Sequence, residues 1–156
     1  YNAYGGGGKG TLISNQNKNI LYLSFSSKTF CIPPLTYKNT KFLSLPLPPG
    51  LKIEMSMDKL EGTIDKNSGQ VCLKFESKFI FSIGVMIKFP ALIVKTSLQT
   101  GKAQGKLHQA KGIGLQKDGK TKLVGISIIP PTGNKILDTF LGLPNEALAE
   151  LECEIQ

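Results

Sequence analysis

The chain has 156 residues, of which 40% are hydrophobic, and its 19 basic and 11 acidic side chains give a net charge of +8 at pH 7. This length fits one domain with a modest core, and no run approaches the ~20 apolar residues of a membrane-spanning helix. All 19 basic residues are Lys and Trp is absent, so the guanidinium group that reads guanine edges is missing. We therefore expect a single domain over residues 1–156, with no transmembrane segment and no specific nucleic-acid recognition; the patterns below predict that this domain is a β-domain.

The amino-terminal residues are expected to form a flexible arm. Residues 1–10 contain four consecutive glycines before Lys9, and the chain begins with Tyr1, as in a processed or trimmed product. The glycines do not predict a phosphate-binding loop, because such a loop leads into a helix and the next residues have strand composition. Two strands are predicted at 10–14 and 19–26, joined by a turn at 16–19.

Residues 30–50 are expected to form a long extended coil on the surface. Prolines occur at 33–34 and repeatedly within 45–50, and proline cannot donate a backbone hydrogen bond to a sheet. A coil of this kind exposes its side chains, so it is also a candidate for contact with a partner.

A long β-hairpin is predicted for residues 52–64 and 71–89, joined by a turn at 65–70. Apolar residues occupy nine of the ten odd positions from 71 to 89. This period of two predicts a strand with one buried face, bent or divided near Gly84.

The register of this hairpin follows from its side chains. Pairing Ile64 with Val71 places Leu60 opposite Phe75 on the apolar face. The same register pairs opposite charges on the other face, Glu61 with Lys74 and Lys59 with Glu76. The match fails beyond Asp58, which lies opposite Ser77, and a bulge or a change of sheet is expected there.

Residues 90–98 predict the next strand, and the Asp118-Gly119 pair predicts a second hairpin with strands at about 105–116 and 121–129. One face of this hairpin is nearly bare. It carries Ala110, Gly112, Gly114, Gly125 and Ser127. Glycine on a strand face lets the sheet coil tightly, or lets another backbone or a flat ligand approach; tight coiling is the simpler interpretation.

The end of the chain predicts a short helix and a last strand. Asn134 is a candidate N-cap, Gly142 would end the helix, and Ile136, Leu137, Phe140 and Leu141 are spaced as one face. A turn is expected at 145–150 and a strand at 151–155. The predicted fold class is all-β, a mainly antiparallel sheet or partly open barrel or sandwich, with a short C-terminal helix and a long Pro-rich coil.

The sequence contains no convincing catalytic or metal-binding pattern, so we expect no enzyme activity, no cofactor and no metal. His108 is the only imidazole, and its place between lysines predicts a surface residue. Cys31, Cys72 and Cys153 are widely spaced, odd in number and without a C-x-x-C pattern. This cysteine usage favours a reducing soluble compartment over secretion.

Three stretches resemble poorly characterised β-sheet proteins of cyanobacteria and algal plastids. They are residues 59–65 (KLEGTID), 71–75 (VCLKF) and 142–148 (GLPNEAL). The resemblance implies a plastid location in the chloroplast stroma, associated with the thylakoid. It also implies a peripheral subunit of a photosynthetic membrane complex, for which the extra stromal-side photosystem I subunit of diatoms and related algae is a candidate.

Two functions follow from these observations. The first is a non-catalytic peripheral structural subunit that docks on a larger protein complex with an acidic surface. Its expected partner-binding residues are Lys38, Lys41, Lys52, Phe30, Tyr37, Phe42 and Leu45. The alternative is a lipocalin-like carrier of a pigment or lipid. The residues expected around that ligand are Phe75, Phe79, Phe81, Ile83, Met55 and Met57.

Overall fold

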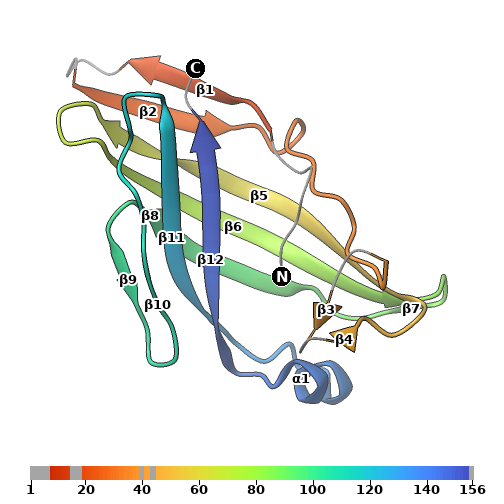
Figure 1. Ribbon diagram of the computed structural model, residues 1–156. Helices are drawn as coiled ribbons and strands as arrows, with labels where there is room; N and C mark the ends of the chain where they lie inside the picture. The colour runs from red at the N-terminus through yellow and green to blue at the C-terminus, as the bar shows by residue number, and fades with distance from the viewer. Residues whose placement is uncertain (1–7, 15–18, 39–40, 43–44, 155–156) are drawn as a thin grey trace.

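The computed structural model describes residues 8–14, 19–38, 41–42 and 45–154, and one twisted antiparallel sheet dominates it (Figure 1). Within these residues the sheet has eight strands in the order β1-β2-β5-β6-β8-β11-β12, with β7 paired to β6. They are β1 (Gly10–Ser14), β2 (Ile20–Phe25), β5 (Leu51–Asp65), β6 (Gln70–Ile83), β7 (Ile87–Lys88), β8 (Leu92–Gln99), β11 (Lys120–Ile129) and β12 (Asn145–Glu154). Outside the sheet lie the pairs β3 (Lys41–Phe42) with β4 (Leu45–Pro46) and β9 (Lys102–Gln104) with β10 (Gln109–Lys111), and the helix α1 (Lys135–Leu141).

The sheet folds over itself without closing. Strands β1 and β12 are its two outer strands in the described part of the chain, so this sheet is not a closed barrel. In Figure 1, β11 and β12 cross one face of β5, β6 and β8 at a steep angle. The prediction of a mainly antiparallel β-protein with a short C-terminal helix is confirmed.

The β5–β6 hairpin has the register that the sequence predicts. Leu60 pairs with Phe75, Glu61 with Lys74 and Ile64 with Val71. The expected bulge is also present, since the register shifts between Met57 and Lys59. The two strands therefore present one continuous apolar face, as alternation requires.

The bulge changes the environment of the two polar residues expected to face each other there. Asp58 turns to the surface, where its carboxylate pairs with Lys78 Nζ at 2.8 Å. Ser77 instead lies opposite Met57, and its buried hydroxyl has no hydrogen-bond partner within the described residues. A bulge that redirects one side chain in this way leaves the ladder on either side intact.

The main core lies between the β2-β5-β6-β8 face and the crossing strands. Leu60, Leu73 and Leu123, from β5, β6 and β11, are each no more than 1% exposed. Side chains of β12, among them Leu151, pack against the same cluster. The crossing strands thus cover the apolar face of the long hairpin and remove it from water.

Glycine lets the sheet turn sharply where β8 meets β11. These strands pair at Val124 and Gln99, and the Thr96 and Ser127 hydroxyls then donate to backbone carbonyls of the opposite strand. A Cβ at Gly125 would lie 2.5 Å from the Ser97 carbonyl oxygen. Gly125 thus permits the close approach of two backbones that this sharp turn of the sheet requires.

The second hairpin differs from its prediction. Its turn is present, with Gly119 at φ 82° and the Gln116 N–H bonded to the Lys120 carbonyl. Residues 105–116, however, do not form one strand: β9 and β10 make a separate small hairpin, and β11 pairs with β8 and β12. Strand β12 also begins at Asn145, where a turn was expected.

The expectation of a surface coil at residues 30–50 is wrong for two of its leucines. Leu35 is 6% exposed and Leu47 is 2% exposed, and both belong to a second core cluster with Leu51 and Phe81. An antiparallel bridge also joins Leu35 to Ile53 of β5. The prolines interrupt pairing, but Leu35 and Leu47 are buried like any other core residue.

Helix α1 begins and ends where the sequence predicts. The Asn134 side chain accepts a hydrogen bond from Leu137 N–H, and Gly142 adopts the left-handed conformation at the C-cap. Leu137 is 3% exposed and joins the second cluster, whereas Ile136 remains 73% exposed. The predicted arm at residues 1–7 and the turn at 16–18 lie outside the described residues.

We predict that Leu73→Ala lowers the free energy of unfolding by about 2–5 kcal/mol, because it removes a fully buried side chain and leaves a cavity. The matched control is Val85→Ala, at a position 94% exposed, which we expect to change stability little. Urea unfolding followed by circular dichroism measures both. Equal losses for the two variants would contradict the proposed position of the core.

Candidate docking site at the β6–β7 tip

The structure describes the side chains of four of the residues predicted to bind a partner, and these four lie in different environments. Phe30 packs against the main core, edge-on to Phe25 with ring centroids 6.2 Å apart. Tyr37 is 48% exposed, and the Lys38 ammonium lies 5.8 Å from its ring centroid. Lys52 pairs with Glu54 at 2.7 Å. Tyr37 and Lys38 are therefore available for contact, whereas Phe30 is partly buried against the main core.

The remaining three predicted residues lie in the small β3–β4 pair. Lys41 pairs with Pro46 and Phe42 with Leu45 along the backbone. Their side chains are outside the described residues, so their part in binding stays a prediction.

A different group of side chains stands out at the far end of the long hairpin. Strand β6 ends at Ile83, Gly84 turns the chain at φ 57°, and β7 returns from Ile87. The exposed fractions are 43% for Ile83, 94% for Val85, 91% for Met86 and 51% for Ile87. This β6–β7 tip, residues 83–88, projects from the end of the sheet (Figure 1).

The backbone of the tip is held firmly even though its side chains are exposed. Ile83 pairs with Ile87 and Ser82 with Lys88 across the β6–β7 turn. The Gly84 N–H also donates to the Gly50 carbonyl at 3.0 Å, which ties the turn to the residue before β5. The apolar side chains are thus presented by an ordered hairpin end.

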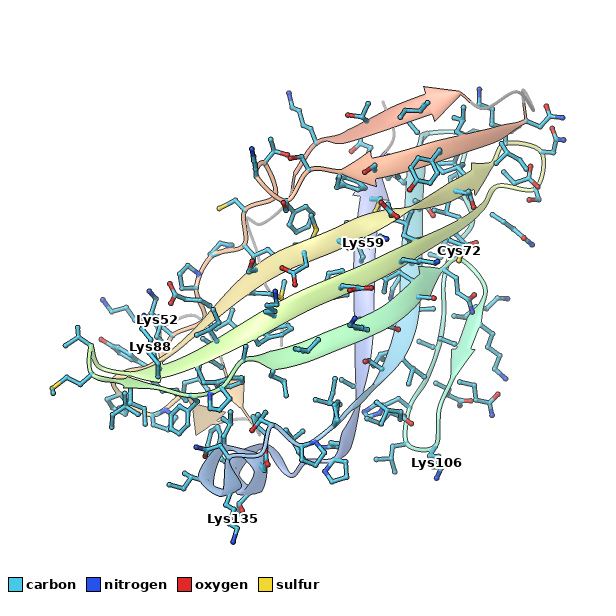
Figure 2. The ribbon with its side chains drawn as sticks, turned by 180° about the vertical axis from the view of Figure 1, so that it is seen from behind. Lys52, Lys59, Cys72, Lys88, Lys106 and Lys135 are labelled. Carbon is cyan, nitrogen blue, oxygen red and sulfur yellow. The ribbon has the colours of Figure 1, made fainter. Side chains whose placement is uncertain are left out.

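Basic side chains lie directly behind the apolar tip. Ser82 of β6 pairs with Lys52 of β5 on one side and with Lys88 of β7 on the other, and Figure 2 shows both lysines at this end. The hydrogen bond and charge of Lys52, with a smaller contribution from Lys88, lower the pKa of the Glu54 carboxyl. This trio keeps one net positive charge at neutral pH.

Sequence reasoning missed this site because the alternation continues through it. The period of two predicts Val85 and Ile87 on the buried face of the strand, and the structure shows that this prediction is wrong for both. The bend expected at Gly84 is confirmed. The exposure of these side chains depends on where the elements that cover the apolar face of the hairpin end. The sequence pattern does not indicate that position.

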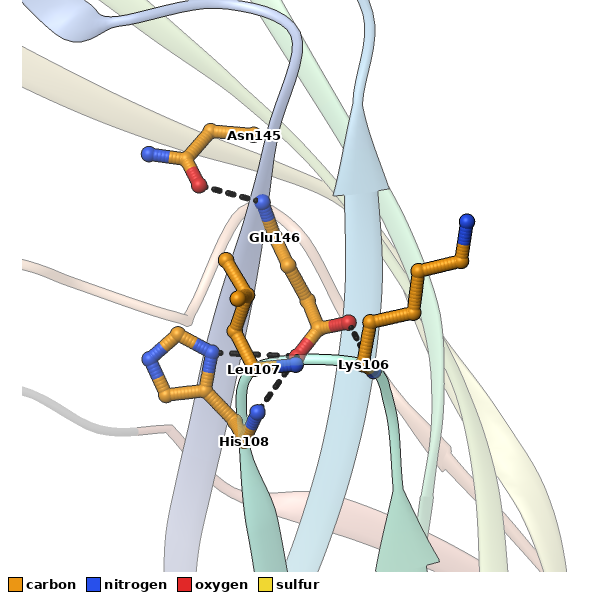
Figure 3. A network of polar contacts seen from close by, with 5 residues as sticks. All are labelled: Lys106, Leu107, His108, Asn145 and Glu146. Atoms are coloured by element: carbon orange, nitrogen blue, oxygen red, sulfur yellow. Dashed lines mark hydrogen bonds and ion pairs between the residues drawn. The ribbon is translucent and has the colours of Figure 1, made fainter.

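A second polar arrangement, also missed from the sequence, fastens the β9–β10 hairpin to β12 (Figure 3). The Glu146 side chain is 4% exposed, and its carboxylate accepts backbone N–H bonds from Lys106, Leu107 and His108 at 2.7–3.0 Å. His108 Nδ1 lies 3.1 Å from the same carboxylate. Burial works against ionisation of Glu146, but these donors outweigh it and lower its pKa.

This arrangement is a structural anchor. The loop donors that would bind an external anion are occupied by the chain's own carboxylate. A Cβ at Gly105 would lie 2.3 Å from a Glu146 carboxylate oxygen, so the loop closes tightly around that group. His108 is partly exposed, as predicted, but its ring contacts Glu146.

The residues proposed for a carrier do not line one cavity. Met57 is buried in the main core and Phe81 in the second cluster, with Phe75 and Phe79 packed against one cluster each. Ile83 is exposed at the tip. Two surface hollows lie elsewhere, one beside the 65–70 turn and one beside Cys153.

Within residues 8–14, 19–38, 41–42 and 45–154, no three or more His, Cys, Asp or Glu side chains gather as a metal site would require. Among the same residues, no helix is long and apolar enough to cross a membrane. The expected lack of enzyme activity and of cofactors stays a prediction. No family model matches the chain, and no similar curated protein or solved structure was found.

We predict a pH-dependent effect of Glu146→Gln. Because the folded-state pKa of Glu146 is lowered, its carboxylate stabilises the fold above the ordinary Glu pKa of about 4.3, and this stabilisation is lost as the pH falls through the lowered value. The variant should have a lower urea midpoint than the wild type at neutral pH, with a difference that shrinks at low pH.

His108→Ala is the control for this experiment, since it keeps all three backbone donors to Glu146. It should lower the urea midpoint at neutral pH by less than Glu146→Gln does. A midpoint difference for Glu146→Gln that stays constant across the pH range would contradict the anchor.

We also predict unequal reactivity of the three thiols. Burial raises the pKa of the Cys153 thiol to about 11, whereas Cys31 and Cys72 are exposed. At pH 8 only roughly one Cys153 in 1,000 is then a thiolate, which is the reactive form. Iodoacetamide labelling followed by mass spectrometry should modify Cys72 and Cys31 well before Cys153. Equal labelling rates in the folded protein would refute this order.

Proposed function

We propose that the protein is a non-catalytic interaction protein that docks peripherally on a larger assembly at a membrane, with the β6–β7 tip as its main docking element. The observation that carries the proposal is the near-complete exposure of Val85 and Met86 at the apex of an ordered hairpin. Clustered apolar side chains on a projecting loop are characteristic of interaction sites, whereas single exposed apolar residues are ordinary.

Packing next to the tip keeps its backbone rigid. The main core and the Leu35–Leu47 cluster hold β5 and β6 up to Leu51 and Phe81. Only about two residues of β6 extend beyond this support, so the apolar group is presented with little loss of conformational freedom on binding.

Charge supports an acidic or anionic counterpart. The chain carries a net charge of +8, and Lys52 and Lys88 lie beside the tip. Long-range attraction of this kind raises the rate of association, while burial of the apolar side chains retains the complex. Tyr37 and Lys38, both exposed, form a second contact within the same proposal.

The identity of the assembly rests on the sequence resemblance alone. A plastid location, at the stromal side of the thylakoid, and docking on a photosynthetic complex such as photosystem I belong to this proposal. The membrane fraction to use in a first experiment is therefore the thylakoid.

The proposal predicts that the double variant Val85→Ser/Met86→Ser loses membrane binding. Each side chain contributes about 1.5–3 kcal/mol when it is fully buried, and 1.4 kcal/mol is a tenfold change in affinity. We expect roughly a tenfold or greater loss in co-sedimentation of the purified chain with thylakoid membranes.

Ile136→Ser is the matched control, because Ile136 is 73% exposed on α1 and is not one of the tip residues 83–88. It should bind like the wild type. Wild-type binding by the double variant would rule out the tip as the docking element.

A further inference from the structure

We infer that the β6–β7 tip binds an anionic lipid bilayer directly, by inserting its apolar side chains into the membrane interface while its lysines contact the headgroup phosphates. The inference rests on the proposed function and specifies what the tip touches.

The composition of the tip favours lipid over a protein pocket. Residues 83–87 read Ile-Gly-Val-Met-Ile, and the only polar side-chain atom among them is the Met86 thioether sulfur, a weak acceptor. Protein interfaces combine apolar contacts with directional hydrogen bonds, which fix the orientation of the partner. A fluid interface between headgroups and acyl chains accepts apolar side chains without such a requirement.

The exposure gradient along the hairpin fits insertion from its end. On one face of β6 and the following turn, the exposed fraction rises from 4% at Phe81 to 43% at Ile83 and 94% at Val85. The last buried residue of this series lies only four positions before Val85. The unsupported part is therefore a short apex, which suits shallow insertion rather than a deep span.

The lysines lie at the depth where the phosphates would be. The Ser82–Lys88 pair is the second pair behind the apex, after Ile83–Ile87, so it lies about 7 Å from the tip at about 3.4 Å per residue. Interfacial segments bury their apolar side about 5–10 Å deep. Long Lys side chains can then reach the headgroups while the apolar residues stay inserted.

The charged groups that face this region favour an anionic surface, moderately. Lys52 and Glu54 come from β5, and Lys88 comes from β7. Lys52 and Glu54 form an ion pair, so the three side chains together carry one net positive charge. The adjoining residues 48–50 are Pro-Pro-Gly and carry no charge. Apolar insertion should therefore supply most of the affinity, with anionic lipid adding to it.

The absence of Trp from the chain allows a direct test with the full-length protein. Met86→Trp places a single fluorescent reporter at the apex, at a position 91% exposed. Ile136→Trp places the control reporter on α1. The probes are vesicles of phosphatidylcholine alone and of phosphatidylcholine mixed with phosphatidylglycerol, both free of protein.

With the mixed vesicles, we expect a blue shift and quenching by brominated acyl chains for the reporter at position 86, and neither for the reporter at position 136. Val85→Ser/Met86→Ser should lower the affinity for these vesicles roughly tenfold or more. Lys88→Gln should lower it a few-fold on mixed vesicles and little on phosphatidylcholine alone.

The outcomes separate this inference from the proposed function. If the reporter at position 86 does not respond to either vesicle while the tip variants still lose binding to protein-containing thylakoid membranes, the tip binds a protein, and the lipid inference is wrong while the docking function stands. If the tip variants bind those membranes like the wild type, both fail.

Discussion

The apolar face of the β5–β6 hairpin has to be covered, and the arrangement of the other elements follows from that requirement. Strands β11 and β12 cross this face and bury Leu60 and Leu73 beneath Leu123. The crossing is possible because Gly125 lets the β8 and β11 backbones approach closely at the corner of the sheet. The Glu146 carboxylate then fixes the β9–β10 hairpin to the start of β12, beside the covering strands.

The covering layer is shorter than the hairpin, and the candidate docking site is the part that it leaves bare. Beyond the reach of β11 and β12, residues 35 and 47 and helix α1 continue the cover as far as Leu51 and Phe81. The same apolar alternation then continues into Ile83 and Val85, which are 43% and 94% exposed. Exposed apolar side chains lower the solubility of the free protein. Their presence at the tip is expected where a partner or a membrane covers them.

How far the sequence predicts this fold depends on the range of the contacts involved. The register around Leu60 and Phe75, the bulge after Met57 and the caps of α1 are set by neighbouring or directly opposed residues, and these predictions were correct. The separate β9–β10 hairpin depends on Glu146, about 40 residues further along the chain, and no local pattern indicates that contact. The tip was misassigned because alternation reports which face is apolar and not what covers it.

Hydrogen–deuterium exchange of the full-length protein, alone and with thylakoid membranes, tests the central claim that the uncovered end of the hairpin is the docking surface. Among the backbone amides of residues 84–87, those of Val85 and Met86 lie in the turn, outside the β6–β7 pairs, and should exchange rapidly in the free protein and become protected on binding, while those around Leu73 are protected in both states. Protection that appears at other surfaces, such as Tyr37 and Lys38 or the β1 edge, and leaves residues 84–87 unchanged would contradict the account.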